Sequence, residues 1–198
     1  MNSRKKNQLF VTLFLLGMFV FTGIMTFVVG PILMEKRDQV AQDKILFKCQ
    51  SVLDGNHIEV QMRAWERPNE NPVFEVKLAG LDAPPLGDAE DPVVIAWAES
   101  RGISPELVAK LNESAFKNLQ AFIRKQNLFL YREDGSRGSE NLEPGSYVHV
   151  FVAGSHANLK QIRSGLALHD TSRPHAFSDK YAEAQAEAKS KQKGLWAK

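Results

Sequence analysis

The residues whose types can do chemistry fall in a few short segments, and each segment has a structural alternative. His57 and Glu59 are two positions apart and can form a metal-binding pair, but on the outward face of a strand they need no such role. Asp54-Gly55 can hold a cation or shape a turn, and the turn preferences of these two residues favour the turn. The acidic stretch 86–91 is typical of a solvated loop.

Composition and charge narrow the class of protein. The 198 residues are 43% hydrophobic and 24% charged, which is typical of a folded chain and excludes wholesale disorder. The single cysteine, Cys49, excludes an intramolecular disulfide framework and any zinc site built from several cysteines. Cys49 lies in an apolar segment and is interpreted as an inert buried thiol.

The basic excess is confined to the N-terminal end. The formal net charge is +2, but 22 basic and 23 acidic residues follow Met34, because Arg4, Lys5 and Lys6 precede it. Proteins that hold nucleic acid by counterion release usually keep a basic excess on their folded part, so nucleic-acid binding is possible but not favoured. Trp65, Trp97 and Trp196 are accordingly interpreted as core or edge anchors and not as base-stacking platforms.

One transmembrane helix is predicted at residues 9–30, after a basic tail at 1–8 and before a polar stalk at 31–44. The segment Leu9–Val29 has no charged residue, and about 20 apolar residues span a bilayer core of roughly 30 Å. A cleaved signal peptide is the alternative, but its apolar core is usually about 7–15 residues long and ends at a small-x-small site, which is missing here. The basic tail favours a cytoplasmic N-terminus and an extracytoplasmic C-terminal domain, periplasmic if the protein is bacterial.

The sequence patterns of the rest of the chain predict both strands and helices. Polar and apolar residues alternate with period two in five segments, which are expected as strands: 45–49, 57–65, 73–81, 128–131 and 147–152. N-terminal capping signals with an apolar stripe or a terminating glycine predict three helices, from 92 to 102, from 105 to 123 and from 180 to 193. Five strands with helices packed on them suit an α+β fold with a small closed barrel, such as an OB-fold.

Five sequence blocks, in this order, resemble the staphylococcal nuclease (thermonuclease) family. They are VLDGNHIEV at 52–60, VKLAGLDAPP at 76–85, ESAFKNLQAFIRKQNLFL at 113–130, YVHVFVAGSHANLKQIRSGLALHD at 147–170 and YAEAQAEAKSKQKGLW at 181–196. The resemblance covers residues 45–198 and implies a five-stranded OB-fold β-barrel with about three helices, preceded by the transmembrane helix. Active members of this family are calcium-dependent phosphodiesterases that cleave DNA and RNA.

The resemblance assigns the family's calcium ligands to this chain only in part. The first calcium-binding aspartate falls on Asn56, whose amide oxygen can ligate calcium but brings no charge. The second falls on Asp82, which is retained, and the residue that offers a carbonyl ligand falls on Ala83. Asp82 and Asn56 are therefore expected to form at most a weak remnant calcium site.

The catalytic positions implied by the resemblance are replaced. The family's glutamate, which orients or deprotonates the attacking water, falls on Pro85, which has no acid–base chemistry. One phosphate-binding arginine falls on Lys77, which keeps the charge but not the bidentate fork. The second falls in the stretch 141–147, which has no basic residue. Asp88, Glu90 and Asp91, together with Arg132 and Arg137, remain as neighbouring groups that can rescue catalysis.

Two functions remain open. The first is a membrane-anchored, catalytically degenerate domain that binds an unknown protein or small ligand on the barrel face and needs no cofactor. The second is an active membrane-bound nuclease with a rearranged site that requires Ca²⁺. Pro85 in place of the glutamate, Asn56 in place of the aspartate and the near-neutral folded part favour the first.

Overall fold

The computed structural model describes residues 46–63, 72–138 and 142–197, and the segment Ile45–Lys198 forms one compact unit. The predicted transmembrane helix at 9–30, with its basic tail and stalk, lies outside the described residues, as does Trp65. Within the described ranges, no helix is both long and apolar enough to cross a membrane.

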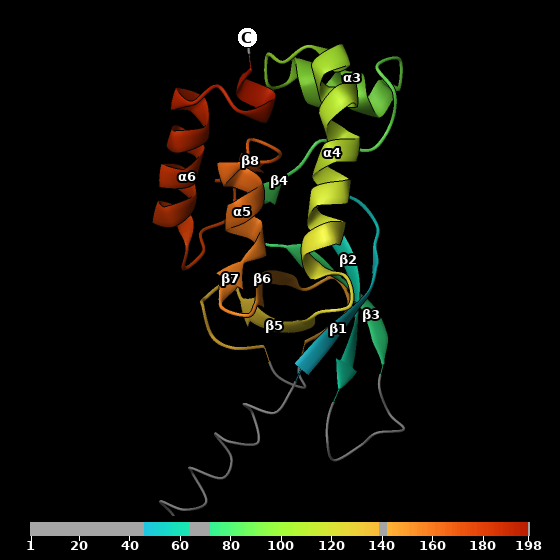
Figure 1. Cartoon of the computed structure of the whole chain (residues 1–198), viewed down its shortest axis with the longest axis vertical. Helices are drawn as coiled ribbons and strands as arrows, with labels where there is room; N and C mark the ends of the chain where they lie inside the picture. The colour runs from blue at the N-terminus through green and yellow to red at the C-terminus, as the bar shows by residue number, and fades with distance from the viewer. Residues whose placement is uncertain (1–45, 64–71, 139–141, 198) are drawn as a thin grey trace, which may run out of the picture. The chain divides into compact units, whose positions relative to one another are not determined.

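Five strands close into a barrel (Figure 1). The strands β1 (Leu46–Val52), β2 (His57–Arg63) and β3 (Val73–Leu78) form an antiparallel meander, and β1 also pairs with β5 (Asn127–Arg132). Strand β6 (Tyr147–Val152) pairs antiparallel with β5 and parallel with β3, which closes the barrel. The predicted five-stranded barrel of OB type is therefore confirmed.

Alternation along the strands explains which residues form the core. In β2, Ile58 and Val60 are fully buried while their neighbours His57 and Glu59 are half-exposed, as a period of two requires. The same pattern in the other barrel strands fills the interior with aliphatic and aromatic side chains, which include Phe47, Val76, Leu78, Leu128, Leu130, Val148 and Val150.

Four helices and three two-residue strands complete the unit. Helices α3 (Pro92–Glu99) and α4 (Pro105–Ile123) begin as predicted, each with a side-chain N-cap followed by proline. The short strands β4 (Leu81–Asp82) and β8 (Leu168–His169) pair with each other, and β7 (Ser155–His156) extends the main sheet. Helix α6 (Ser178–Ser190) and the 3-10 turn η2 (Gly194–Trp196) end the described chain.

Within residues 46–63, 72–138 and 142–197 the structure contains four α-helices, which corrects the expectation of about three. The helix that the sequence pattern misses is α5 (Ala157–Arg163), which follows β7 directly and has no side-chain hydrogen bond at its N-cap, His156. Because its start carries no capping signal and it is only seven residues long, local pattern does not reveal it. Its stability comes from burial of residues such as Asn158 and Ile162 against the barrel and α6.

Asn158 ties α5 to the closure of the barrel. Its side chain is fully buried; Oδ1 accepts from the Val150 N–H at 2.9 Å, and Nδ2 donates to the carbonyls of Ala79 and Val148 at 3.0 and 3.2 Å. One amide therefore satisfies three backbone groups at the point where β3 and β6 meet. Buried polar groups of this kind are costly to leave unpaired.

We expect Asn158→Ala to lower the free energy of unfolding by about 3 kcal/mol, because it leaves buried backbone groups without partners. Urea unfolding of the detergent-solubilised full chain, followed by circular dichroism, measures the change. The matched control is Asn127→Ala on the exposed first residue of β5, which should change stability by less than about 0.5 kcal/mol. Equal effects of the two substitutions would contradict the role given to Asn158.

Candidate functional site

The turn between β1 and β2 is built around Asp54. Its Oδ1 accepts from the backbone N–H groups of Asn56 and His57 at 2.6 and 2.8 Å, and its Oδ2 contacts His57 Nδ1 at 2.7 Å. Asp54 thus shapes the turn, which is the structural alternative favoured by the sequence. His57 is paired with Asp54, and Glu59 instead accepts a hydrogen bond from the Ser51 hydroxyl, so the two do not form a metal-binding pair.

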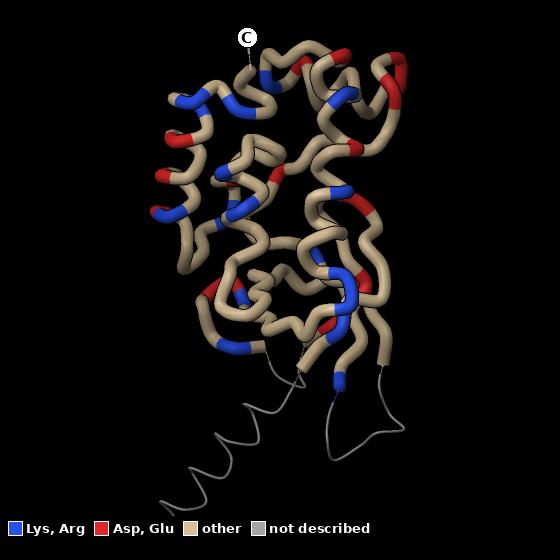
Figure 2. The backbone as a smooth tube through the Cα atoms, viewed as in Figure 1, with Lys and Arg blue, Asp and Glu red and all other residues tan. Residues whose placement is uncertain are grey.

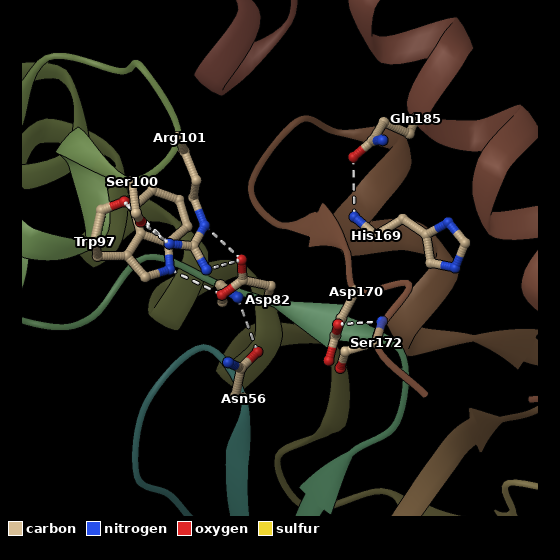
Figure 3. Close-up of polar contacts among 10 residues, drawn as sticks. Asn56, Asp82, Trp97, Ser100, Arg101, His169, Asp170, Ser172 and Gln185 are labelled. Carbon is tan, nitrogen blue, oxygen red and sulfur yellow. Dashed lines mark hydrogen bonds and ion pairs between the residues drawn. The ribbon is translucent and has the colours of Figure 1, made fainter. Parts of the chain in front are cut away.

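This turn packs tightly against the segment that follows β4. A Cβ on Gly55 would lie 2.5 Å from the Ala83 Cβ, so only glycine fits without a shift. The Asn56 side chain accepts a hydrogen bond from the Ala83 N–H at 3.0 Å. The Asn56 side chain therefore lies beside the backbone that directly follows Asp82 (Figure 3).

The retained carboxylate, Asp82, is fully engaged with protein groups. Its Oδ1 accepts from the indole N–H of Trp97 at 2.8 Å, and its Oδ2 accepts from Arg101 Nε and Nη2 at 2.6 and 2.5 Å (Figure 3). The guanidinium of Arg101 also stacks on the Trp97 ring, with Cζ 4.4 Å from a ring centroid. The positive charge beside Asp82 is therefore supplied by the chain itself.

Pro85 and the loop behind it are held by a buried amide on α4. Asn112, which is 4% exposed, donates from Nδ2 to the carbonyls of Pro85 and Gly87 at 3.0 and 2.7 Å. In the same loop Asp88 accepts from the Glu90 N–H, and Asp91 accepts from the Val93 N–H as the N-cap of α3. Both aspartates are thus engaged in local backbone capping.

Lys77 lies at the end of β3 and faces a different neighbourhood. Its Nζ is 5.8 Å from the centroid of the Tyr147 ring, and Arg173 stacks on the same ring with Cζ at 4.1 Å. Arg173 forms a bidentate pair with Glu133, through Nε–Oε1 at 2.7 Å and Nη2–Oε2 at 3.0 Å, which raises its pKa. These residues, apart from Lys77, line a cavity of about 560 Å³ that also includes Arg132.

The side chains expected to form the remnant calcium site already make hydrogen bonds within the chain. Both Asp82 oxygens already accept hydrogen bonds, and Asn56 Oδ1 accepts from Ala83. Across the described part of the chain, no group of three or more His, Cys, Asp and Glu side chains has the placement of a metal site. A cation bound at Asp82 would compete with the Arg101 guanidinium for Oδ2.

Cys49 behaves as the sequence predicted. Its side chain is buried, and burial raises the pKa of the thiol from 9.0 to about 11. A thiol with such a pKa is protonated at neutral pH and therefore a poor nucleophile or metal ligand.

Sequence reasoning missed two arginines. Arg101 follows Trp97 by four positions, a spacing that places both side chains on one face of a helical segment and could have indicated their stacking. Arg173 lies in the irregular stretch after β8, and only the fold carries it to Tyr147. Both arginines lie beside positions of the implied site, and each is neutralised by a carboxylate.

The fold and the site define a barrel of the OB type in which a turn between β1 and β2 packs on a carboxylate-bearing strand. The sequence model of the family described as "Staphylococcal nuclease homologue" matches residues 75–198. The chain therefore belongs to the staphylococcal nuclease homologue family. The comparison with curated proteins finds no match.

The match begins within β3, so β1, β2 and the Asp54–His57 turn precede the matched residues. The structure nevertheless pairs β1 and β2 with the matched strands β5 and β3. The barrel is complete only with these two strands.

The interaction between Asp82 and Arg101 can be measured by a double-mutant cycle. We expect Arg101→Gln and Asp82→Asn each to lower the unfolding free energy by about 1–2 kcal/mol, and the double variant to lose less than the sum, with a coupling of about 1 kcal/mol. The pair is partly exposed, at 29% and 24% of the two side chains, which limits its strength.

Denaturant unfolding of the four proteins gives the coupling energy. The matched control is the exposed pair of Lys117 and Glu113, with side chains 66% and 67% exposed, for which we expect a coupling below about 0.5 kcal/mol. Strictly additive effects of Arg101→Gln and Asp82→Asn would contradict the internal neutralisation of Asp82.

Proposed function

We propose that this protein is a catalytically degenerate, membrane-anchored member of the staphylococcal nuclease homologue family that acts as a binding or assembly module. The observation that carries the proposal is the pairing of Asp82 with Arg101 and Trp97. The arginine provides the positive charge that a bound cation would otherwise bring to this carboxylate.

The other positions of the implied site support loss of nuclease activity. Pro85 has no proton to exchange, and loss of a general base typically costs about 10²–10⁴-fold in rate. Asp88 and Asp91 of the adjacent loop are engaged with backbone N–H groups of their own loop, which supports the proposal that they do not replace the missing base. Arg173 and Lys77 both contact the Tyr147 ring. Because the Arg173 guanidinium already forms a bidentate pair with Glu133, it is not free to bind a phosphate in this arrangement.

The ligand we propose is a protein segment or a small polar molecule bound on the barrel face near Tyr147. The cavity there is lined by two arginines and by three carboxylates, Glu133, Asp134 and Glu143. Such a mixture of charges disfavours a polyanion and suits a partner that carries both signs. Lys, Arg, Asp and Glu are also interspersed along the rest of the described backbone (Figure 2).

We further propose that residues 9–30 anchor the protein in a membrane, with the domain on the extracytoplasmic side. The proposal rests on the uncharged stretch Leu9–Val29 and on the basic residues that precede it.

We expect the full chain in detergent to show no EDTA-sensitive cleavage of single-stranded DNA or RNA at millimolar Ca²⁺, because the base is missing and Asp82 is occupied. Gel and fluorogenic assays compare it with the Lys77→Ala/Asp82→Ala variant, which should be indistinguishable. Calcium should likewise leave the thermal midpoint of the wild type unchanged, since a ligand that binds only the folded state raises that midpoint.

A gain-of-function series provides the matched test. The variant Asn56→Asp/Arg101→Gln restores the carboxylate and removes the competing cation, so we expect calcium to raise its thermal midpoint. Asn56→Asp alone is the control and should respond less. EDTA-sensitive cleavage by the wild type that disappears in the Lys77→Ala/Asp82→Ala variant would instead establish an active nuclease with a rearranged site.

We expect the full chain to remain in the membrane pellet after alkaline carbonate extraction. Replacing Leu15 and Leu16 with Arg should release it, because charges in the centre of the span oppose insertion. A matched Leu15→Ala/Leu16→Ala variant should remain in the pellet. Recovery of the unmodified full chain in the soluble fraction would contradict anchoring.

A further inference from the structure

Four of the chain's five histidines gather around one buried tyrosine, and one of them, His169, lies on β8, the strand that pairs with Leu81–Asp82. Tyr181 on α6 is fully buried and lies within 6 Å, between ring centroids, of each of them. They come from four separate places in the chain, namely His149 on β6, His156 on β7, His169 on β8 and His175 in the connection to α6. Helix α6, which carries Tyr181, lies beside α5 (Figure 1).

A short chain of hydrogen bonds runs through this histidine–tyrosine cluster. His149 Nδ1 lies 2.8 Å from the Tyr181 hydroxyl, and the same hydroxyl lies 3.0 Å from His156 Nε2. A hydroxyl donates one hydrogen bond and accepts another, so His149 Nδ1 and His156 Nε2 both have a partner while the two rings are neutral. The link connects β6 and β7 of the main sheet to α6.

Other nitrogens of the cluster have no partner. The Nε2 atoms of His149, His169 and His175 are buried and make no hydrogen bond. His175 Nδ1 accepts from the Phe177 N–H at 3.2 Å, so in a neutral ring the proton is on Nε2, which packs against Gly80. A second proton on His149 would place a charged N–H where no acceptor exists.

Burial keeps these histidines neutral. It lowers the pKa of His149 from 6.5 to about 3, and the neighbouring His156 and His175 lower it further. Burial also lowers the pKa of His156 to about 3, assisted by Lys180 and His175. The pKa values of His169 and His175 are lowered by burial as well, although Asp170 opposes the shift at both and Glu133 opposes it at His175.

We propose that the histidine–tyrosine cluster is an acid-sensitive latch, which holds α6 and the segment 170–177 on the barrel at neutral pH and releases them in acid. The latch goes beyond the proposed function and depends neither on nucleic acid nor on the membrane. Two features produce it. The Tyr181 hydroxyl joins neutral His149 and His156 by hydrogen bonds, and three buried Nε2 atoms of the cluster have no acceptor for an added proton.

The direction of the pH response follows from the states that bind protons. Once α6 opens, the exposed histidines have pKa values near 6.5, so the open state binds protons at a pH at which the closed state does not. Opening is therefore disfavoured above about pH 6.5 and becomes steadily easier as the pH falls below that value toward 3. His149 and His156, whose pKa values are about 3 in the closed state, each shift the equilibrium by about 30-fold between pH 7.5 and 5.0 when opening exposes them.

Hydrogen–deuterium exchange of the full chain in detergent tests the latch. After correction for intrinsic rates, we expect opening of α6 and of residues 170–177 to increase by at least about 30-fold from pH 7.5 to 5.0. Strand β2 contributes none of the four histidines, so its amides serve as the internal control and should change by less than about threefold. An unchanged α6 would overturn the proposal.

Two variants separate the latch from general acid sensitivity. His149→Asn/His156→Gln keeps hydrogen-bonding atoms near Tyr181 but removes two titrating groups, so the acid response of α6 should fall at least tenfold. His57→Gln removes the fifth histidine, which lies outside the cluster, and should retain the full response. An equal response in both variants would overturn the proposal.

Should the double variant fail to fold, NMR of selectively labelled histidines in the wild-type chain gives the answer. We expect the His149 and His156 resonances to remain those of neutral imidazole at pH 5.0 in the closed state, while α6 exchange increases. Cluster histidines that titrate near 6.5 without any change in α6 would refute the latch. Release of α6 by EDTA at pH 7.5 would refute it too, because the cluster would then be a metal site.

Discussion

The parallel pairing of β3 with β6 is the constraint on which the rest of the structure depends. Only two register pairs join these strands, Lys77 with Tyr147 and Leu78 with Val148, and the buried amide of Asn158 reinforces the junction. Closure at this point converts a meander into a barrel and leaves no open edge on β3 at this end. It also directs the chain after Leu78 across the barrel end toward β4, and so determines where Asp82 lies.

At Asp82, electrostatics rather than packing decides the character of the site. A half-buried carboxylate needs a compensating positive charge, and a metal ion or a side chain can provide it. Here Trp97, near the C-terminal end of α3, provides a hydrogen bond, and Arg101, just beyond that helix, provides the charge and further hydrogen bonds. Arg173 is likewise paired with Glu133, so Arg101 and Arg173 both have carboxylate partners within the chain.

The opposite side of β6 has a different chemistry. Most of the core is aliphatic, but around Tyr181 the interior is made of imidazole and aromatic rings, with His149 stacked edge-on to Phe177 at 4.6 Å. Neutral imidazoles pack as small aromatic rings and also form hydrogen bonds, so this region is stable only while they stay uncharged. The same strand thus contributes to barrel closure through Val148 and to the histidine–tyrosine cluster through His149.

The sequence by itself determined the barrel strands and the two capped helices α3 and α4. These follow from local periodicity, capping residues and ordered motifs, which depend on neighbours in the chain. Tertiary structure alone decided that α5 forms without a cap and that Arg101 pairs with Asp82. It also decided that Arg173 stacks on Tyr147 and that four histidines surround Tyr181. Each of these features joins segments that are far apart in the sequence or depends on burial. Neither can be predicted from a local sequence pattern.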